Sequence, residues 1–313
     1  MLKTDERNVL VIVGPTAVGK SSLGIRLSLL FNAEIVSADS RQIYKYMDIG
    51  TAKPSKFDLA SIPHHLIDEI HPDQDFNLSL FLRKARKAID DIHKKGKLPI
   101  LLGGTGQYIW ALLEGWQVPA VAPNIGLRST LEKQARIHGN HFLYEELMKL
   151  DPGIAKNIDR NNIRRLIRAI EKLKDTAYQT ELEKLRLRKD PPAYKLKIIG
   201  LNLNRETLYK IADNRVDKMI KQGWVEEVEN LLLKGYTKEL PSLSSIGYIQ
   251  IIDYLESMTT LDYAIEQTKY KTHSYIRNQN SWFKKSDSRI VWMDAQYEIS
   301  DVVNLVSEWL PLK

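Results

Sequence analysis

Short apolar runs alternate with amphipathic segments along the first third of the chain. An apolar run over residues 8–13 ends in glycine, which is typical of a buried parallel strand. Runs of the same kind predict further strands over 34–37 and 98–102. Helical patterns lie between and after these runs, over 21–30, 81–97 and 107–115. This alternation predicts a doubly wound α/β sheet, in which ligands bind beyond the carboxyl ends of the strands.

The pattern changes after residue 118. Residues 127–189 carry helical patterns throughout, until a Pro-Pro pair at 191–192 breaks them. Residues 196–203 then predict a strand that rejoins the sheet, and the chain from Arg205 onward is mostly helical in pattern.

These changes predict two domains, and charge separates them. We expect a core formed by residues 1–117 and 199–313, and an all-helical insertion over 118–198. Residues 121–200 hold seventeen Lys and Arg against ten Asp and Glu, which accounts for the whole net charge of +7. A basic excess confined to one segment indicates a polyanionic partner. From charge alone, a solvated, lysine-rich helical face is the favoured explanation.

Composition narrows the class of protein further. The chain has no cysteine, which excludes disulfides and thiolate metal sites. No apolar run reaches the length of a membrane span, and the first ten residues lack an apolar signal-peptide core. We therefore expect a cytoplasmic protein without a membrane partner. The absence of a long apolar heptad run favours a monomer.

A glycine-rich turn follows the first predicted strand and precedes a helix. Its sequence, GPTAVGKS over 14–21, fits the pattern G-x-x-x-x-G-K-[ST]. In such a P-loop, backbone N–H groups cradle phosphates, Lys20 neutralises them and the Ser21 hydroxyl ligates Mg²⁺. The loop indicates a polyphosphate ligand without saying which one.

Candidate chemistry also follows the second strand. Asp39, in SADSRQIY, lies just past the predicted strand end, near the P-loop. It is a candidate general base, a candidate magnesium ligand, or a loop aspartate that caps its own turn. Ser40, Arg41 and Gln42 add groups able to hydrogen-bond a base edge.

Three further stretches offer weaker signals. GGTGQY, over 103–108, permits close approach of a ligand to the backbone at a strand end. Arg164 and Arg168 recur on one side of the helix predicted for NNIRRLIRAIEKLK, a geometry that suits a phosphate backbone or a solvated face. Arg215 lies on a core helix and is a candidate partner for a transferring phosphate.

Taken in order, these stretches resemble one known family. GPTAVGKS, SADSRQIYKYMDIGTAKP, GGTGQYIWALL, RRLIRAIE, SIGYIQ and NQNSWF resemble segments of the tRNA dimethylallyltransferases, also called tRNA isopentenyltransferases. The resemblance runs from about residue 8 to 285. It implies an enzyme with a P-loop NTPase-like parallel sheet flanked by helices, and a helical insertion that grips the tRNA anticodon stem-loop.

The resemblance also implies an activity. Members transfer a dimethylallyl group from dimethylallyl diphosphate to N6 of the adenosine beside the anticodon, position 37 of tRNA. The diphosphate would then be that of an isoprenoid, bound with Mg²⁺; whether ATP also enters the loop is left open.

Site residues follow from the same resemblance. Asp39, Lys20 and Arg215 are the implied catalytic groups, with Arg215 on the leaving diphosphate, and Ser21 is the implied metal ligand. The implied diphosphate-binding residues are Gly14, Pro15, Thr16, Ala17, Val18, Gly19, Lys20 and Ser21. The implied tRNA-binding residues are Asp39, Ser40, Arg41, Gln42, Thr105, Arg128, Arg164, Arg165 and Arg168.

The chain departs from the family pattern near its C-terminus. Gln250 stands where members often have Glu, Asn278 where they usually have Arg, and Ser281 where they have Thr. Three alternatives remain from the residues themselves: a P-loop small-molecule kinase, an adenylate prenyltransferase, and a non-catalytic RNA-binding protein. The basic insertion argues against the first two, and the intact Lys20–Ser21 pair against the third.

Overall fold

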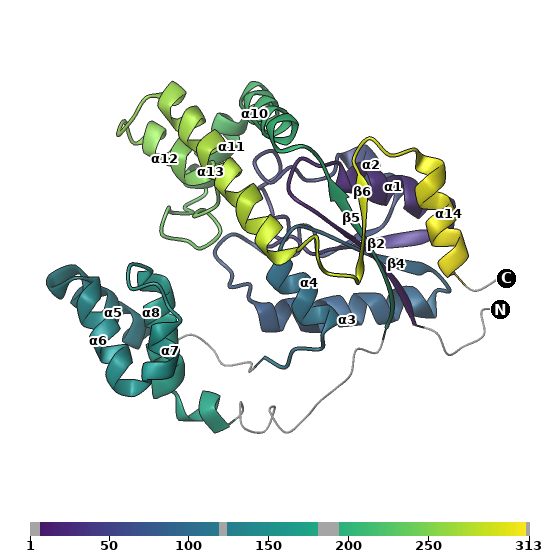
Figure 1. Cartoon of the computed structure of the whole chain (residues 1–313). Helices are drawn as coiled ribbons and strands as arrows, with labels where there is room; N and C mark the ends of the chain where they lie inside the picture. The colour runs from purple at the N-terminus through teal and green to yellow at the C-terminus, as the bar shows by residue number, and fades with distance from the viewer. Residues whose placement is uncertain (1–6, 119–123, 181–193, 311–313) are drawn as a thin grey trace. The chain divides into compact units, whose positions relative to one another are not determined.

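The computed structural model describes residues 7–118, 124–180 and 194–310. The chain forms two compact units, described separately here: Met1–Trp116 with Pro192–Lys313, and Gln117–Pro191 (Figure 1). Residues 195–198, which the expected insertion 118–198 includes, belong to a strand of the first unit, where Ile198 pairs with Val11. Among the described residues, no helix combines the length and apolar character that a membrane crossing requires.

A six-stranded parallel sheet organises the first unit. Its strand order is β3-β2-β4-β1-β5-β6, and every neighbouring pair is parallel, as the apolar runs predict. All six residues of the central strand β1 are buried, and after Asn8 the other five form an unbroken apolar run, as expected of a buried parallel strand. The strands are β1 (Asn8–Val13), β2 (Ala33–Ser37), β3 (His64–His65), β4 (Leu98–Leu102), β5 (Lys195–Asn202) and β6 (Ile290–Asp294).

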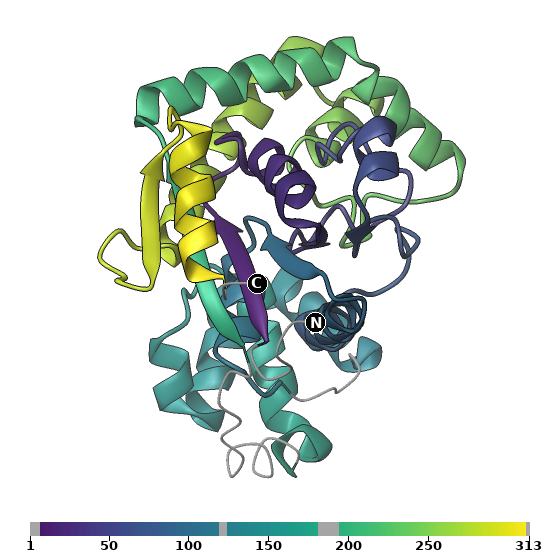
Figure 2. The same cartoon turned by 90° about the vertical axis from the view of Figure 1, so that its right-hand side faces the viewer.

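Helices cover both faces of the sheet. Figures 1 and 2 show α1 and α14 over one face, and α3 and α4 over the other. Leu27 of α1 and Val302 and Val306 of α14 share one buried cluster with β1 and β4. The helices in this part of the unit are α1 (Lys20–Phe31), α2 (Lys56–Ser61), α3 (Leu78–Lys94), α4 (Gly106–Leu113) and α14 (Ile299–Trp309).

Four further helices follow β5 and pack on one another at the carboxyl side of the sheet (Figure 1). They are α10 (Arg205–Lys221), α11 (Trp224–Leu233), α12 (Tyr248–Leu255) and α13 (Leu261–Trp282). The expectation of mostly helical structure after Arg205 omitted β6. This strand is a short edge strand with partly exposed residues, so it lacks the unbroken apolar run of a buried strand.

The chain direction across the sheet reverses between β1 and β4. After β1 the chain passes to β2 on one side, and after β4 it passes to β5 on the other. Neighbouring parallel strands whose connections run in opposite directions across the sheet leave a crevice at their carboxyl ends, where α/β proteins bind ligands. The P-loop follows β1 and the GGTG turn follows β4, so both lie at this crevice.

The second unit is a small helical domain with its own core. Leu131, Leu143, Leu147, Leu166 and Ile170 are buried together. Residues 157–162 form a turn within the stretch predicted to be helical, and 181–189 lie outside the described residues. Its helices include α5 (Ile125–His138), α6 (Asn140–Leu150), α7 (Pro152–Lys156) and α8 (Ile163–Lys174), and residues 176–180 are also helical.

Candidate active site

The P-loop joins β1 to α1 through two glycines with positive φ. A Cβ on Gly14 would lie 2.6 Å from the carbonyl oxygen of Leu201 in β5, so the loop passes too close to the sheet for any side chain. Gly19 has φ +97° and precedes the first residue of α1. As the N-cap residue, Gly19 has no side chain to cap this helix end, so the backbone N–H groups of the first turn are available to a phosphate.

Lys20 lies in a place where its positive charge is costly. The pKa of Lys20 is lowered to about 7, chiefly by burial and also by the charge of Arg215, while the charge of Asp39 acts in the opposite direction. The Lys20 amine donates a hydrogen bond to the carbonyl oxygen of Pro15, 2.7 Å away. A bound polyanion would restore full protonation, because the nearby negative charge favours the ammonium form.

Two side chains from distant helices fix Thr16 in the P-loop. Arg215 of α10 donates to the Thr16 hydroxyl at 2.6 Å. Gln279 of α13 accepts the Thr16 N–H at 2.7 Å and donates its amide N–H to the carbonyl oxygen of Gly104 at 3.1 Å. Gln279 is 3% exposed, so this amide ties the P-loop and the GGTG turn to α13.

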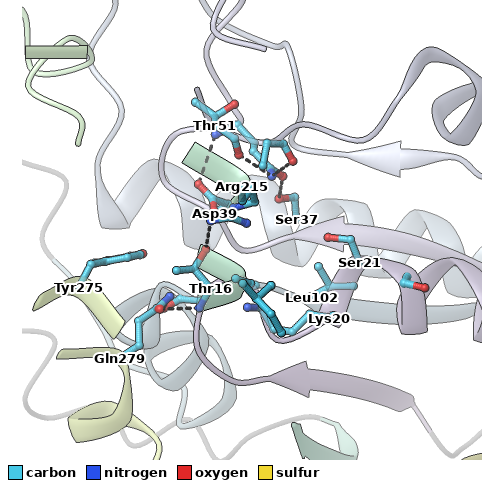
Figure 3. Close-up of a pocket in the computed structure, with 18 residues that line it drawn as sticks. Thr16, Lys20, Ser21, Ser37, Asp39, Thr51, Leu102, Arg215, Tyr275 and Gln279 are labelled. Atoms are coloured by element: carbon cyan, nitrogen blue, oxygen red, sulfur yellow. Dashed lines mark hydrogen bonds between the residues drawn. The ribbon is translucent and has the colours of Figure 1, made fainter. Parts of the chain in front are cut away.

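A cavity of about 350 Å³ opens over the P-loop and is called here the P-loop cavity. Figure 3 shows Asp39, Arg215 and Thr16 in the middle of the view, with Lys20 and Ser21 on one side and Tyr275 and Gln279 on the other. The P-loop residues that line this cavity are Thr16, Ala17, Gly19, Lys20 and Ser21. The other predicted loop residues do not line it: Gly14 faces β5, Val18 is buried in the core, and Pro15 accepts the Lys20 hydrogen bond.

A second cavity of about 300 Å³ adjoins the first. Ser40, Arg41 and Trp224 line this second cavity and not the P-loop cavity. The two cavities share a wall formed by Thr16, Asp39, Thr51, Ala52, Arg215 and Tyr275. A carboxylate, a guanidinium and a phenol therefore stand where two ligands, one in each cavity, would meet.

Asp39 also has the local role that a loop aspartate commonly has. Its Oδ1 accepts the backbone N–H groups of Arg41 at 2.8 Å and Gln42 at 3.3 Å. These bonds hold the Asp39 carboxylate against the turn. Asp39 nevertheless lines both cavities. Turn capping and proton transfer are thus compatible in one residue, and the role of general base stays a prediction.

The residues after Asp39 form hydrogen bonds within the protein. Gln42 donates to the carbonyl oxygens of Thr51 and Ala52, both at 3.2 Å. Arg41 donates to the carbonyl oxygen of Pro241 at 2.6 Å, and the N–H of Ser40 donates to the Thr105 hydroxyl at 3.3 Å. Thr105 thereby joins the loop after β2 to the start of α4 without lining either cavity.

Trp224 forms one wall of the second cavity and explains two glycine positions. A Cβ on Gly50 would lie 2.1 Å from its Nε1, and a Cβ on Gly247 would lie 1.9 Å from its Cη2. Glu227, three residues further along α11, accepts the N–H groups of Asp48 at 2.8 Å and Ile49 at 2.7 Å. The loop that contains MDIGTAKP is thus held against α11.

The sequence reading missed most of the contribution of α13. Thr268, Thr272, Tyr275 and Gln279 recur at helical spacing and line one or both cavities. Burial raises the pKa of the Tyr275 phenol, and the charge of Asp39 raises it further. A polar stripe at i, i+4, i+7 and i+11 was the available signal, because buried helix faces are ordinarily apolar.

The departures near the C-terminus have simple structural counterparts. Gln250 accepts the N–H of Gly247 at 2.7 Å and so closes the first turn of α12, which Gln and Glu do equally well. Asn278 is exposed, and its carbonyl oxygen accepts a hydrogen bond from Ser281.

The predicted arginines of the helical unit fall into two pairs. Glu171, 2% exposed, accepts from Arg128 at 2.9 and 3.0 Å and also from Arg168. Burial alone would raise the pKa of Glu171, but these hydrogen bonds outweigh it and lower the pKa. Arg164 and Arg165 are exposed on α8. Exposed guanidinium groups are the better candidates for phosphate contacts, whereas the first pair also holds α5 to α8.

The residues around the P-loop cavity suit a magnesium ion bound together with phosphates. No group of three His, Cys, Asp or Glu side chains in the described ranges could hold a metal by itself. Ser21 and Asp39 both line the cavity. Mg²⁺ characteristically takes one or two protein oxygens, substrate phosphate oxygens and water.

The pKa of Lys20 predicts how anion binding varies with pH. Above about pH 7 the free protein loses the Lys20 proton, whereas a complex with pyrophosphate retains it. The complex then binds one more proton than the free protein, so the affinity for pyrophosphate falls by up to about tenfold for each unit by which the pH rises. Calorimetric titration with pyrophosphate between pH 7 and 9 measures this fall.

Lys20→Arg supplies the matched control, because arginine keeps its charge across this range and the ligand titrates identically with both proteins. We expect the difference between the two pH profiles to appear above pH 7. Parallel profiles would show that Lys20 does not titrate there.

Comparison with known proteins places these features in a family. The model of the IPP transferase family matches residues 42–286, and that of the isopentenyl transferases matches 7–71. A tRNA dimethylallyltransferase of Roseiflexus castenholzii is 47% identical over 277 residues, covering 88% of this chain and 90% of that protein. One of Dehalococcoides mccartyi is 44% identical over 303 residues, covering 96% and 92%.

Solved structures agree with the sequence matches. The crystal structure of a tRNA isopentenylpyrophosphate transferase from Bacillus halodurans has a TM-score of 0.71 and 34% identity, covering 97% of each chain. A eukaryotic dimethylallyltransferase, captured acting on tRNA, has a TM-score of 0.77 and 28% identity, covering 96% of this chain and 77% of that one.

Proposed function

Because the chain belongs to the IPP transferase family, we propose that it is a tRNA dimethylallyltransferase. It transfers a dimethylallyl group from dimethylallyl diphosphate to N6 of the adenosine beside the anticodon, at position 37. The products are N6-isopentenyladenosine in tRNA and diphosphate. The monomeric state and the cytoplasmic location stay predictions.

One observation carries the assignment of roles. Asp39 and Arg215 lie on the wall that the P-loop cavity shares with the second cavity. A diphosphate held by the P-loop and an adenine in the second cavity would meet at these residues. A kinase needs a phosphate acceptor at this position, whereas a prenyltransferase needs the amine and a group to take its proton.

The chemistry assigns a distinct part to each side chain. The exocyclic amine of adenine is a weak nucleophile, so the leaving group must be strongly stabilised. As the allylic C–O bond breaks, its electron pair goes to the diphosphate, where P-loop amides, Lys20 and Arg215 stabilise the charge. As the C–N bond forms, Asp39 accepts the proton from N6.

A magnesium ion would bind through Ser21 and the diphosphate oxygens, with Asp39 within the same cavity. When bound, it adds positive charge to the leaving group. The depressed pKa of Lys20 suits the same task, because the ammonium forms fully only when the anion is present.

Transfer of label tests the proposed function. The purified protein is incubated with labelled dimethylallyl diphosphate, Mg²⁺ and unmodified tRNA, with AMP and ATP as competing acceptors. We expect label in tRNA, in N6-isopentenyladenosine after digestion. Label in AMP or ATP would indicate a nucleotide prenyltransferase, and a phosphorylated product without prenyl transfer would indicate a kinase.

The exposed arginines of α8 are expected to contact the tRNA backbone. The double variant Arg164→Ala, Arg165→Ala should weaken tRNA binding and reduce the slope of log K against log salt by about 2, one for each phosphate contact. Filter binding between 50 and 200 mM salt measures both quantities.

Lys133→Ala with Arg136→Ala removes the same charge from exposed positions of α5 and is the matched control. We expect its salt slope to stay close to that of the unaltered protein. An equal reduction in both variants would show that net charge, rather than the α8 arginines, governs binding.

A further inference from the structure

Three aromatic side chains from separate segments gather beside the second cavity. The ring centroids of Tyr46 and His71 are 5.7 Å apart, and the Tyr236 hydroxyl lies 3.4 Å from Nδ1 of His71. Tyr46 comes from the loop after β2, His71 from the loop after β3, and Tyr236 from the turn after α11. We call Tyr46, His71 and Tyr236 the aromatic platform.

Tyr46 is held in a costly conformation while its ring stays open to solvent. Its backbone has φ +67°, in the left-handed region that bulky residues seldom adopt. Its side chain is nevertheless 43% exposed, so core packing does not account for the ring. A strained backbone that presents a side chain outward is characteristic of binding sites.

The platform also carries positive charge. The ammonium of Lys234 lies 5.3 Å from the centroid of the Tyr46 ring, within the range of a cation–π contact. Lys234 is exposed and has a long flexible stem, so its ammonium can move to a phosphate while another planar group occupies the ring. An aromatic face beside a mobile cation is the pairing that single-stranded nucleic-acid sites use.

Hydrogen bonds connect the platform to the rim of the second cavity. Arg41, on that rim, donates to the carbonyl oxygen of Pro241, and the Ser242 hydroxyl donates at 2.7 Å to the carbonyl oxygen of Pro72. Pro72 directly follows His71 of the platform. The platform is therefore linked to the rim of the second cavity through Pro72 and residues 241–242.

We propose that the aromatic platform binds an unpaired base of the anticodon loop, stacked on Tyr46, while the neighbouring adenosine enters the second cavity. The inference rests on the proposed function and adds a second base site to it. RNA loops are recognised chiefly by stacking splayed bases on aromatic side chains. A base fixed on the platform holds the strand so that the flipped adenosine does not withdraw.

Tyr46→Asn tests the platform, because asparagine is among the non-glycine residues that adopt positive φ most readily. The variant keeps the loop and removes the ring. We expect KM for tRNA to rise by about 5- to 150-fold, the range for one base stacked on an aromatic ring. The affinity for pyrophosphate, which binds at the P-loop, should not change. Tyr46→Phe, which keeps the ring, should restore KM to within about twofold.

Phe57→Asn is the matched control, since Phe57 is an aromatic residue of α2 that is 79% exposed; it should leave KM unchanged. A tRNA with 2-aminopurine beside the target adenosine reports stacking directly: its fluorescence should be quenched on the unaltered protein and on Tyr46→Phe, but not on Tyr46→Asn. If Tyr46→Asn still transfers the dimethylallyl group to tRNA with an unchanged KM and still quenches the 2-aminopurine fluorescence, the platform would be overturned while the proposed function would stand. Failure of the unaltered protein to prenylate tRNA would overturn the proposed function instead.

Discussion

Asp39→Asn is expected to lower the rate of dimethylallyl transfer by about 10²–10⁴-fold, the contribution of a positioned general base. The amide oxygen of asparagine can still accept the N–H groups of Arg41 and Gln42, so the turn after β2 should keep its shape. An amide has no useful affinity for the proton of N6, so the chemical step slows while both substrates still bind. Single-turnover transfer at saturating tRNA and dimethylallyl diphosphate isolates this step.

Binding measurements complete the test of Asp39. The dissociation constants for tRNA and for pyrophosphate should stay within about threefold of the unaltered values. Asp301→Asn, at an exposed position of α14 away from both cavities, controls for loss of a carboxylate. An Asp39→Asn protein that turns over at the full rate would remove Asp39 from the mechanism and leave only its turn-capping role.

Arg215→Met is expected to reduce kcat by about 10²–10³-fold, the cost of removing one donor to charge that develops in the transition state. Arg215 holds the Thr16 hydroxyl and lies on the shared wall of the cavities, so it can stabilise the diphosphate as it leaves. The loss should fall mainly on kcat, because the stabilised charge grows during the reaction. Steady-state kinetics over both substrates give the two constants separately.

Arg215→Lys distinguishes charge from geometry at this position. Lysine keeps a positive charge but cannot bond Thr16 and an anion at once with a planar fork. We expect it to recover less than a tenth of the lost rate. Full recovery would mean that a point charge suffices, and unchanged kcat in Arg215→Met would place the leaving group elsewhere.

The four strands β1, β2, β4 and β5 and the P-loop could be predicted because their signals are local, whereas the short edge strands β3 and β6 were not predicted. A mostly apolar strand, a glycine turn and the following helix lie within residues 8–31, and the structure has them as predicted. The position of Asp39 after β2 follows from parallel strands in the same way. These features need no knowledge of distant parts of the chain.

The rest of the site depends on contacts that a local pattern does not contain. Gln279 bonds Thr16 across 263 positions of the chain, and Trp224 fits against glycines of two other loops. The sequence does not distinguish Arg128 and Arg168 from Arg164. In the structure, the first two donate hydrogen bonds to a buried glutamate, and Arg164 is exposed. Pairing of this kind depends on which side chains folding brings together.

The glycines around Trp224 bear on how the substrate range of this enzyme could be altered. Substitution at Gly50 or Gly247 cannot reshape the second cavity, because any added methyl group would collide with the indole of Trp224. Trimming the indole itself, which spans the gap between them, is the open route. Trp224 is therefore the natural starting point for testing whether the second cavity, the proposed adenine site, can be enlarged to accept modified purines.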